Sequence, residues 1–340
     1  MITSNFDQLT PLVCSSRARC LASLQDGGAI HRPDSVLWRS CIYDLRQDIM
    51  RHCILSVKAG GGGMSYATLT VHLQIGRPND NVLAVTQALA KTHQAAVIGI
   101  AATDRSENFT NEEYYLVSAS LEKGFAKWQS HLAAAEAEFH AALQGLAEIE
   151  WRPVSVGPTI TESLIQEARG TDLLIVCADQ PINPPYQIQP FDLGELVVHS
   201  GRPVLAVPKA TITSPKFDRG IIYWKDTLET RRAVADALPL LKSASIVSLV
   251  QVIEQDRMTA ESARMEAVMA WLGRHGVKVN LMVVEAATSD ADVLRTVTSE
   301  EKPDFGVAGL YSHNRLRERI FGGVSRDLLR QVNRCVLLSH

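Results

Sequence analysis

The chain has 340 residues, a mass of 37.3 kDa and a formal net charge of -3. Hydrophobic residues make up 46% and charged residues 21%, a balance that indicates a folded globular protein and excludes disorder throughout. The near-neutral charge gives no support for a nucleic-acid binder, which carries a basic face. No run approaches the roughly 18 apolar residues of a membrane span. We therefore expect a cytoplasmic protein with neither nucleic acid nor membrane as a partner.

Residues 1–63 show no helical or strand periodicity and end in the glycine run 60–63. A glycine run before a methionine is what a purine-rich ribosome-binding sequence yields when it is translated. We expect Met64 to be the natural start and residues 1–63 to be a disordered or spurious leader. The alternative is a real leader followed by a flexible glycine linker.

Four of the six cysteines lie in this leader, and their spacing matches no CxxC-type zinc pattern. We expect stray thiols there and no metal site. Cys177 and Cys335 sit in apolar runs and are expected to be small core residues.

From Met64 onward, strand and helix patterns alternate. In the first half the predicted strands are 68–74, 95–101, 151–156, 173–177 and 203–207. The predicted helices are 81–92, 112–148 with a break near Lys123 and Gly124, 159–168 and 193–200. Residues 210–217 contain Ser214-Pro215 and are predicted to be a linker.

The same order then repeats. The predicted strands are 221–224, 244–253, 277–284, 305–309 and 335–339, and the predicted helices are 229–241, 260–275, 289–299 and 325–332. Alternating strands and helices require parallel sheets with right-handed crossovers. We expect an α/β protein of two doubly wound, five-stranded parallel-sheet domains in tandem, 64–209 and 218–340.

The loop 309–325 carries the chemistry that is easiest to interpret. It follows a buried strand and leads into a helix, and such a helix N-terminus offers unpaired N–H groups to an anion. Arg315, Arg317 and Arg319 add positive charge. These features predict an anion-binding loop; the alternative is a solvated basic turn.

This segment resembles the C-terminal third of the universal stress proteins, which carry a Gly-x2-Gly-x9-Gly-(Ser/Thr) loop around the phosphates of ATP. Further matches are Trp224–Thr227 with Arg232–Leu241 in the second half and, more weakly, Ser65–Leu73 with Gly201–Pro208 in the first. The resemblance implies a universal-stress, adenine-nucleotide α-hydrolase-like fold and a stress-response role. It places a degraded nucleotide site at Gly309, Ser312, His313, Gly322, Gly323 and Ser325, with further contacts at Lys225 and Asp226.

The departures from this family pattern bear on the ligand. Ser312 replaces the middle glycine, Gly323 lacks the phosphate-binding hydroxyl, and Lys225 replaces the acidic residue that ends the first strand. A lysine cannot accept the hydrogen bonds that a carboxylate accepts. In the first half Gln74 takes that place and the glycine pattern is missing, so we expect ATP as a ligand of the second domain alone.

Three hypotheses about function remain open. The first is nucleotide sensing or protein association without catalysis. The second is weak ATP hydrolysis or nucleotidyl transfer on the same fold, with His313 as a general base. The third is a ligand-free dimerisation scaffold. Since family members pair through their last strands, we expect 203–207 and 336–339 to pair within one chain or in a homodimer.

Overall fold

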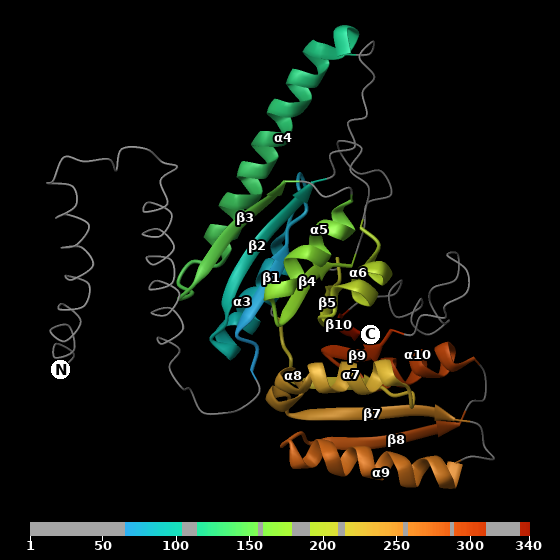
Figure 1. Cartoon of the computed structure of the whole chain (residues 1–340). Coiled ribbons are helices and arrows are strands. Elements are labelled where there is room, and N and C mark those ends of the chain that lie inside the picture. Colours follow the sequence, from blue (N-terminus) through green and yellow to red (C-terminus); the bar gives the residue numbers. More distant parts are fainter. Residues whose placement is uncertain are drawn as a thin grey trace, which may run out of the picture. The chain divides into compact units, whose positions relative to one another are not determined.

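The computed structural model describes residues 65–103, 114–155, 159–178, 191–209, 215–253, 258–285, 289–310 and 334–340. All described residues belong to one compact unit, Gly63–His340 (Figure 1). The predicted leader and its four cysteines therefore lie outside the described residues.

Within these described ranges, ten strands form one sheet in the order β3-β2-β1-β4-β5-β10-β9-β6-β7-β8. They are β1 Thr68–His72, β2 Ala96–Thr103, β3 Ile149–Ser155, β4 Leu173–Cys177, β5 Val204–Val207, β6 Arg219–Tyr223, β7 Ile246–Ile253, β8 Val279–Glu285, β9 Phe305–Gly309 and β10 Cys335–Ser339. Neighbours are parallel except for β5 and β10, which run antiparallel. The α/β fold class is confirmed, and the two predicted five-stranded sheets are joined edge to edge.

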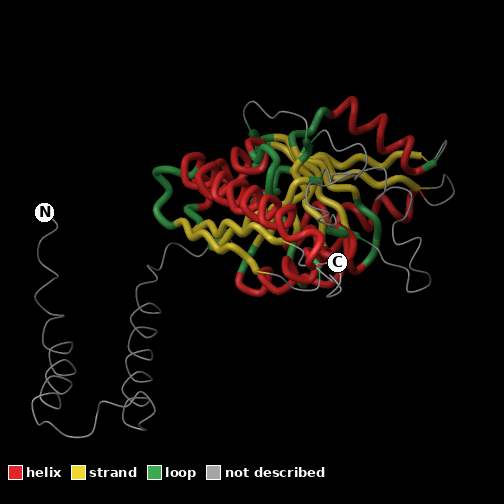
Figure 2. The backbone as a smooth tube through the Cα atoms, turned by 90° about the horizontal axis from the view of Figure 1, so that it is seen from above, coloured by secondary structure: helices red, strands yellow, loops and turns green. Residues whose placement is uncertain are grey.

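Helices cover both faces of this sheet (Figure 2). They are α3 Asp80–His93, α4 Tyr114–Ala142, α5 Ile160–Glu167, α6 Leu193–Ser200, α7 Leu228–Asp236, α8 Leu238–Ser243, α9 Met258–Arg274 and α10 Asp290–Glu301, with a short 3-10 turn at Ala168–Gly170. One apolar cluster packs the sheet against α3, α4, α7, α8 and α9, and a second packs it against α5, α6 and α10. Both clusters contain residues of both halves, so the halves share their core.

The antiparallel pair β5–β10 makes this core continuous. Val336 pairs with Ala206, Leu337 with Leu205, and Leu338 with Val204. The side chains of all these residues are buried. This is the intramolecular alternative for the last strands, and it leaves β5 and β10 with a strand on each side.

An aspartate at the same place in each half shows the internal repeat at atomic level. Oδ2 of Asp172, just before β4, accepts hydrogen bonds from the backbone N–H groups of Ala67 and Thr68 at 2.8 and 2.9 Å. Oδ2 of Asp304, just before β9, accepts from those of Asp218 and Arg219 at 3.1 and 2.9 Å. Each carboxylate thus ties the fourth strand of its half to the start of the first.

Two predicted helices differ from the observed ones. The predicted break near Lys123 and Gly124 is wrong, since α4 runs unbroken for 29 residues and tolerates one glycine at a cost of about 1 kcal/mol. The predicted helix 229–241 is divided at Ala237 into α7 and α8. Pro239 explains the division, because its ring lacks an N–H and clashes with the carbonyl four residues earlier. The predicted helix 325–332 lies outside the described residues.

Candidate functional site

The strand order reverses between β6 and β9 in the second half. β7 and β8 follow β6 on one side, whereas β9 and β10 lie on the other. In doubly wound sheets a ligand binds beyond the carboxyl ends of the strands at such a reversal. The segments at that position are residues 224–227, which follow β6, and the chain after Gly309 at the end of β9.

The segment after β6 leads directly into α7. The backbone N–H of Trp224 donates to the carbonyl of Val250, which is the last bond of this chain segment to β7. Oγ1 of Thr227 then caps α7 by accepting from the backbone N–H of Thr230 at 3.3 Å. Thr227 is therefore a positioning residue that the sequence analysis missed, although a threonine before an acidic first turn is a known signal for a helix start.

Lys225 and Asp226 are both exposed at this edge. The carboxylate of Asp226 accepts two hydrogen bonds from the Arg231 guanidinium, at 2.7 and 3.2 Å. Asp226, a predicted contact residue, thus already has a cationic partner in Arg231 of the following helix α7. The ammonium group of Lys225 has no such pairing among the described contacts, and it places a positive charge beside the reversal point.

Gly309 lies directly against the first turn of α7. A Cβ at this position would come within 2.5 Å of the carbonyl carbon of Glu229 and 2.6 Å of the Cα of Thr230. Real Cβ atoms do not approach backbone atoms that closely, so only glycine fits. The structure thus gives this predicted site residue a packing role, which brings the end of β9 against the start of α7.

Two further features of the first turn of α7 were not anticipated. The side chain of Leu228 is 55% exposed, an unusual position for a large apolar group. Within the described residues, Oε2 of Glu229 is buried and accepts no hydrogen bond. A buried carboxylate oxygen without a donor is costly. The first turn of α7 thus presents an exposed apolar side chain beside a buried carboxylate oxygen that has no donor among the described residues.

The remaining predicted site residues lie outside the described residues. They are Ser312, His313, Gly322, Gly323 and Ser325. Their roles as nucleotide contacts stay a prediction. Of the predicted set, the structure places Gly309, Lys225 and Asp226 at one edge of the sheet.

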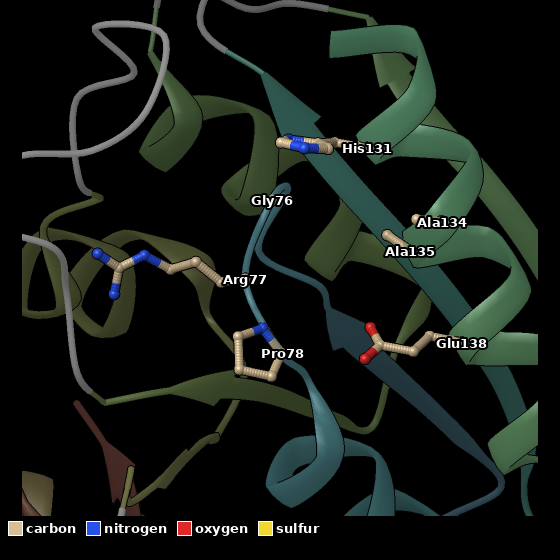
Figure 3. A pocket seen from close by; sticks show the side chains of 7 residues that line it. All are labelled: Gly76, Arg77, Pro78, His131, Ala134, Ala135 and Glu138. Carbon is tan, nitrogen blue, oxygen red and sulfur yellow. The ribbon is translucent and has the colours of Figure 1, made fainter. Parts of the chain in front are cut away.

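The corresponding edge of the first half is organised differently. A pocket of about 360 Å³ lies between the loop that precedes α3 and one face of α4 (Figure 3); its lining residues are Gly76, Arg77, Pro78, His131, Ala134, Ala135 and Glu138. The Glu138 carboxylate accepts a 2.9 Å hydrogen bond from Nδ2 of Asn79, the N-cap residue of α3. The Asn79 amide also bonds to the backbone of Gln74 at both its nitrogen and its oxygen. The protein's own carboxylate thus sits at the helix start where an anionic ligand would lie.

His72, at the end of β1, is buried against the ring of Phe191 at a centroid distance of 5.6 Å. Within the described residues, Nδ1 of His72 has no hydrogen-bond partner, which is uncommon for a buried polar atom. Burial lowers the pKa of His72 to about 4, because the charged imidazolium would be desolvated. The imidazole is therefore neutral at physiological pH.

Three further features of the described residues concern metal ligands, helix composition and the two cysteines. In the part of the chain that the structure describes, no three His, Cys, Asp or Glu side chains are placed to hold a metal ion. None of the described helices combines the length and apolar character that crossing a bilayer requires. Cys335 is buried, which raises the pKa of its thiol to about 12, whereas Cys177 is partly exposed.

Solved structures with this architecture identify the fold. A universal stress protein from Archaeoglobus fulgidus DSM 4304 matches with a TM-score of 0.57 and 16% identity, covering 79% of this chain and 97% of that one. The chain has the universal stress protein fold. A functionally unknown protein from Pseudomonas aeruginosa PAO1 has a TM-score of 0.49 and 16% identity over 79% of this chain and 92% of its own.

A shorter solved structure is also similar to part of this chain. A universal stress protein in complex with cAMP has a TM-score of 0.30 and 17% identity, covering 36% of this chain and 96% of its own. No family model matches the sequence, and no curated protein matches it. The resemblance drawn from the sequence motifs is therefore confirmed at the level of the fold.

Proposed function

We propose that this chain is a cytoplasmic stress-response protein of the universal stress type, which binds an adenine nucleotide in its second domain and acts by nucleotide sensing or association with other proteins rather than by catalysis. The observation that carries the proposal is the position of Gly309. It ends β9 at the reversal of strand order, flush against the first turn of α7. Ligands of doubly wound sheets bind at this position.

The chemistry of the described residues is compatible with a phosphate-bearing ligand. The exposed Lys225 supplies positive charge, and the N-terminus of α7 adds its partial positive charge. In this proposal the glycines and hydroxyls of the loop, Gly322, Gly323 and Ser325 among them, supply the phosphate contacts. The first domain, 64–209, takes no nucleotide, and the Glu138 carboxylate at the start of α3 supports this asymmetry.

One observation favours the ligand-free scaffold as a second candidate. One oxygen of the Asp226 carboxylate, Oδ1, is bound by Arg231, which competes with a ribose hydroxyl for that acceptor. Lys225, the residue before it, has no acceptor atom. If both positions have lost their role in recognition, the features that remain for a scaffold are the shared apolar clusters and the β5–β10 pairing.

A titration of the full chain with ATP and with cAMP, followed by calorimetry, tests the proposal. Lys225→Ala is expected to weaken ATP binding several-fold, whereas Arg77→Ala, a cation after the first strand of the other half, leaves it unchanged. Binding without release of phosphate supports sensing. Release of phosphate that depends on His313 supports the hydrolase, and no binding at millimolar nucleotide overturns the proposal in favour of the scaffold.

A further inference from the structure

The pocket between α4 and the loop before α3 is framed by two contacts between that helix and that loop. At one end the His131 imidazole lies over Gly76, where a Cβ would come within 2.6 Å of its Nδ1 (Figure 3). At the other end the Glu138 carboxylate accepts the 2.9 Å hydrogen bond from Asn79. Seven residues of an α-helix span about 10 Å, so these contacts hold the loop against the helix at two points two turns apart.

Small side chains keep the space between the two contacts open. Ala134 and Ala135 occupy the helix face between His131 and Glu138, and Pro78 lines the pocket from the loop (Figure 3). The volume of about 360 Å³ lies within the range of small-molecule sites. The middle of the pocket is therefore an apolar hollow that can hold a compact hydrocarbon or aromatic group.

The loop wall of this pocket is fixed by the protein's own bonds. Gly76 has a φ of 73°, in the left-handed region that glycine adopts without strain. Asn79 is buried, and its amide bonds to the backbone of Gln74 and of Arg77. The same amide holds Glu138. A wall held at several points is already ordered, which lowers the entropy cost of binding a ligand.

The charge that the pocket offers is negative. Glu138 directs its carboxylate toward the loop, whereas the Arg77 guanidinium points away from α4 (Figure 3). Asp80, in the first turn of α3, adds a second carboxylate at the same helix start. An anion is repelled by these charges. A carboxylate has about four acceptor positions, and the bonds from Asn79 use at most two of them, so Glu138 can still accept from a ligand.

We propose that this pocket binds a small organic cation, a primary amine that carries a compact apolar or aromatic body. The ammonium group donates a charge-assisted hydrogen bond to Glu138, and the body lies on Ala134 and Ala135. The contacts at Gly76 and Asn79 close the hollow at both ends, which suits a free small molecule better than a segment of chain. The first half thus recognises a ligand opposite in charge to the nucleotide proposed for the second.

Titration of the full chain with three probes that share one aromatic body tests the proposal. The probes are phenethylamine, phenethyl alcohol and hydrocinnamate, which are cationic, neutral and anionic, and ligand-observed NMR measures their binding. Phenethylamine is expected to bind with a dissociation constant of roughly millimolar order. The alcohol and the anion are expected to bind at least about tenfold more weakly, because neither donates from a positive charge.

Three variants assign the binding to this pocket. Glu138→Gln is expected to weaken phenethylamine binding at least about tenfold, because the amide keeps an acceptor for Asn79 but loses the charge. Ala134→Leu fills the hollow from an exposed helix position and is expected to abolish binding. Glu136→Gln, on the same helix but outside the pocket lining, leaves binding unchanged.

The outcomes separate ligand recognition from a loss of stability. Thermal melts of the three variants are expected to match the wild type. A wild-type chain that binds no phenethylamine at tens of millimolar overturns the proposal, and so does equal binding of phenethylamine and hydrocinnamate. Unchanged binding in Glu138→Gln also overturns it. A parallel titration with ATP reports on the second half, so a failure of either proposal leaves the other standing.

Discussion

The hydroxyl of Tyr66 donates a 2.9 Å hydrogen bond to the backbone carbonyl of Asp236, which ties the start of β1 in the first half to the end of α7 in the second. The carboxylate of Asp236 in turn accepts a 2.6 Å bond from the hydroxyl of Ser339 in β10. The halves therefore meet at a polar contact as well as along β5 and β10. The first turn of α7 lies against Gly309 and its last residue, Asp236, makes this contact, so one helix joins the candidate site to the first half.

Tyr66→Phe is expected to lower the free energy of unfolding by about 1 kcal/mol, because it leaves the Asp236 carbonyl without its donor. Urea unfolding measures this loss. Tyr223→Phe is the matched control, since the Tyr223 hydroxyl bonds to Thr298 inside the second half at 3.1 Å. If the contact joins the halves, Tyr66→Phe alone increases proteolysis of the segment between β5 and β6; equal cleavage in both variants would contradict this.

Gly309→Ala is expected to destabilise the protein by about 1–3 kcal/mol, since the new methyl group collides with the backbone of Glu229 and Thr230. Gly273→Ala, in α9, is expected to stabilise it by about 1 kcal/mol, because a Cβ there meets nothing and alanine is the better helix former. Thermal denaturation distinguishes the two. A neutral Gly309→Ala would show that the close approach to α7 is absent in solution.

Asp172→Ala and Asp304→Ala are expected to have similar effects, because each removes the acceptor of two backbone N–H groups. The loss of each carboxylate should cost about 1–3 kcal/mol. Chemical denaturation of both variants measures the cost. Asp290→Ala, an exposed aspartate in the first turn of α10, is the control and should change stability by less than about 0.5 kcal/mol. Strongly unequal effects of the two substitutions would contradict the structural equivalence of the halves.

His72 predicts a loss of stability in mild acid. Its pKa is about 4 in the folded protein against 6.5 for an exposed histidine, so the unfolded chain binds the proton first as the pH falls. The free energy of unfolding keeps the full contribution of neutral His72 above pH 6.5. That contribution declines as the pH falls toward 4, by on the order of 3 kcal/mol at most. In His72→Leu this part of the pH dependence should vanish, whereas His199→Gln, at an exposed histidine, should retain it. Unfolding free energies measured at several pH values check this, and an unchanged slope in His72→Leu would rule it out.

The order of strands and helices is local information, and the sequence contained nearly all of it. Buried parallel strands such as Leu173–Cys177 and Phe305–Gly309 are continuous apolar runs, and their predicted bounds match the observed ones. Where local patterns were ambiguous, as at Lys123 and Gly124, the prediction of a break was wrong.

The candidate site was predictable in place but not in detail. Glycine at position 309 was recognised from its spacing in a loop motif, yet its contact with Thr230 depends on a helix about 80 residues earlier in the chain. The pairing of Asp226 with Arg231 spans five residues, and its geometry follows from the cap at Thr227. No spacing rule indicates that the carboxylate of Asp226 will accept hydrogen bonds from Arg231.

The 340-residue sequence by itself determined that this protein is α/β and that it repeats, and it predicted a ligand site after β9, because periodicity, turn residues and motif spacing are properties of neighbouring residues. The tertiary structure alone decided that the repeats share one sheet and both of its apolar clusters. It also decided that β5 and β10 use each other's edges and that β8 is left open at the end of the sheet. Those outcomes depend on which distant surfaces bury each other, and burial between residues more than a hundred positions apart leaves no local pattern.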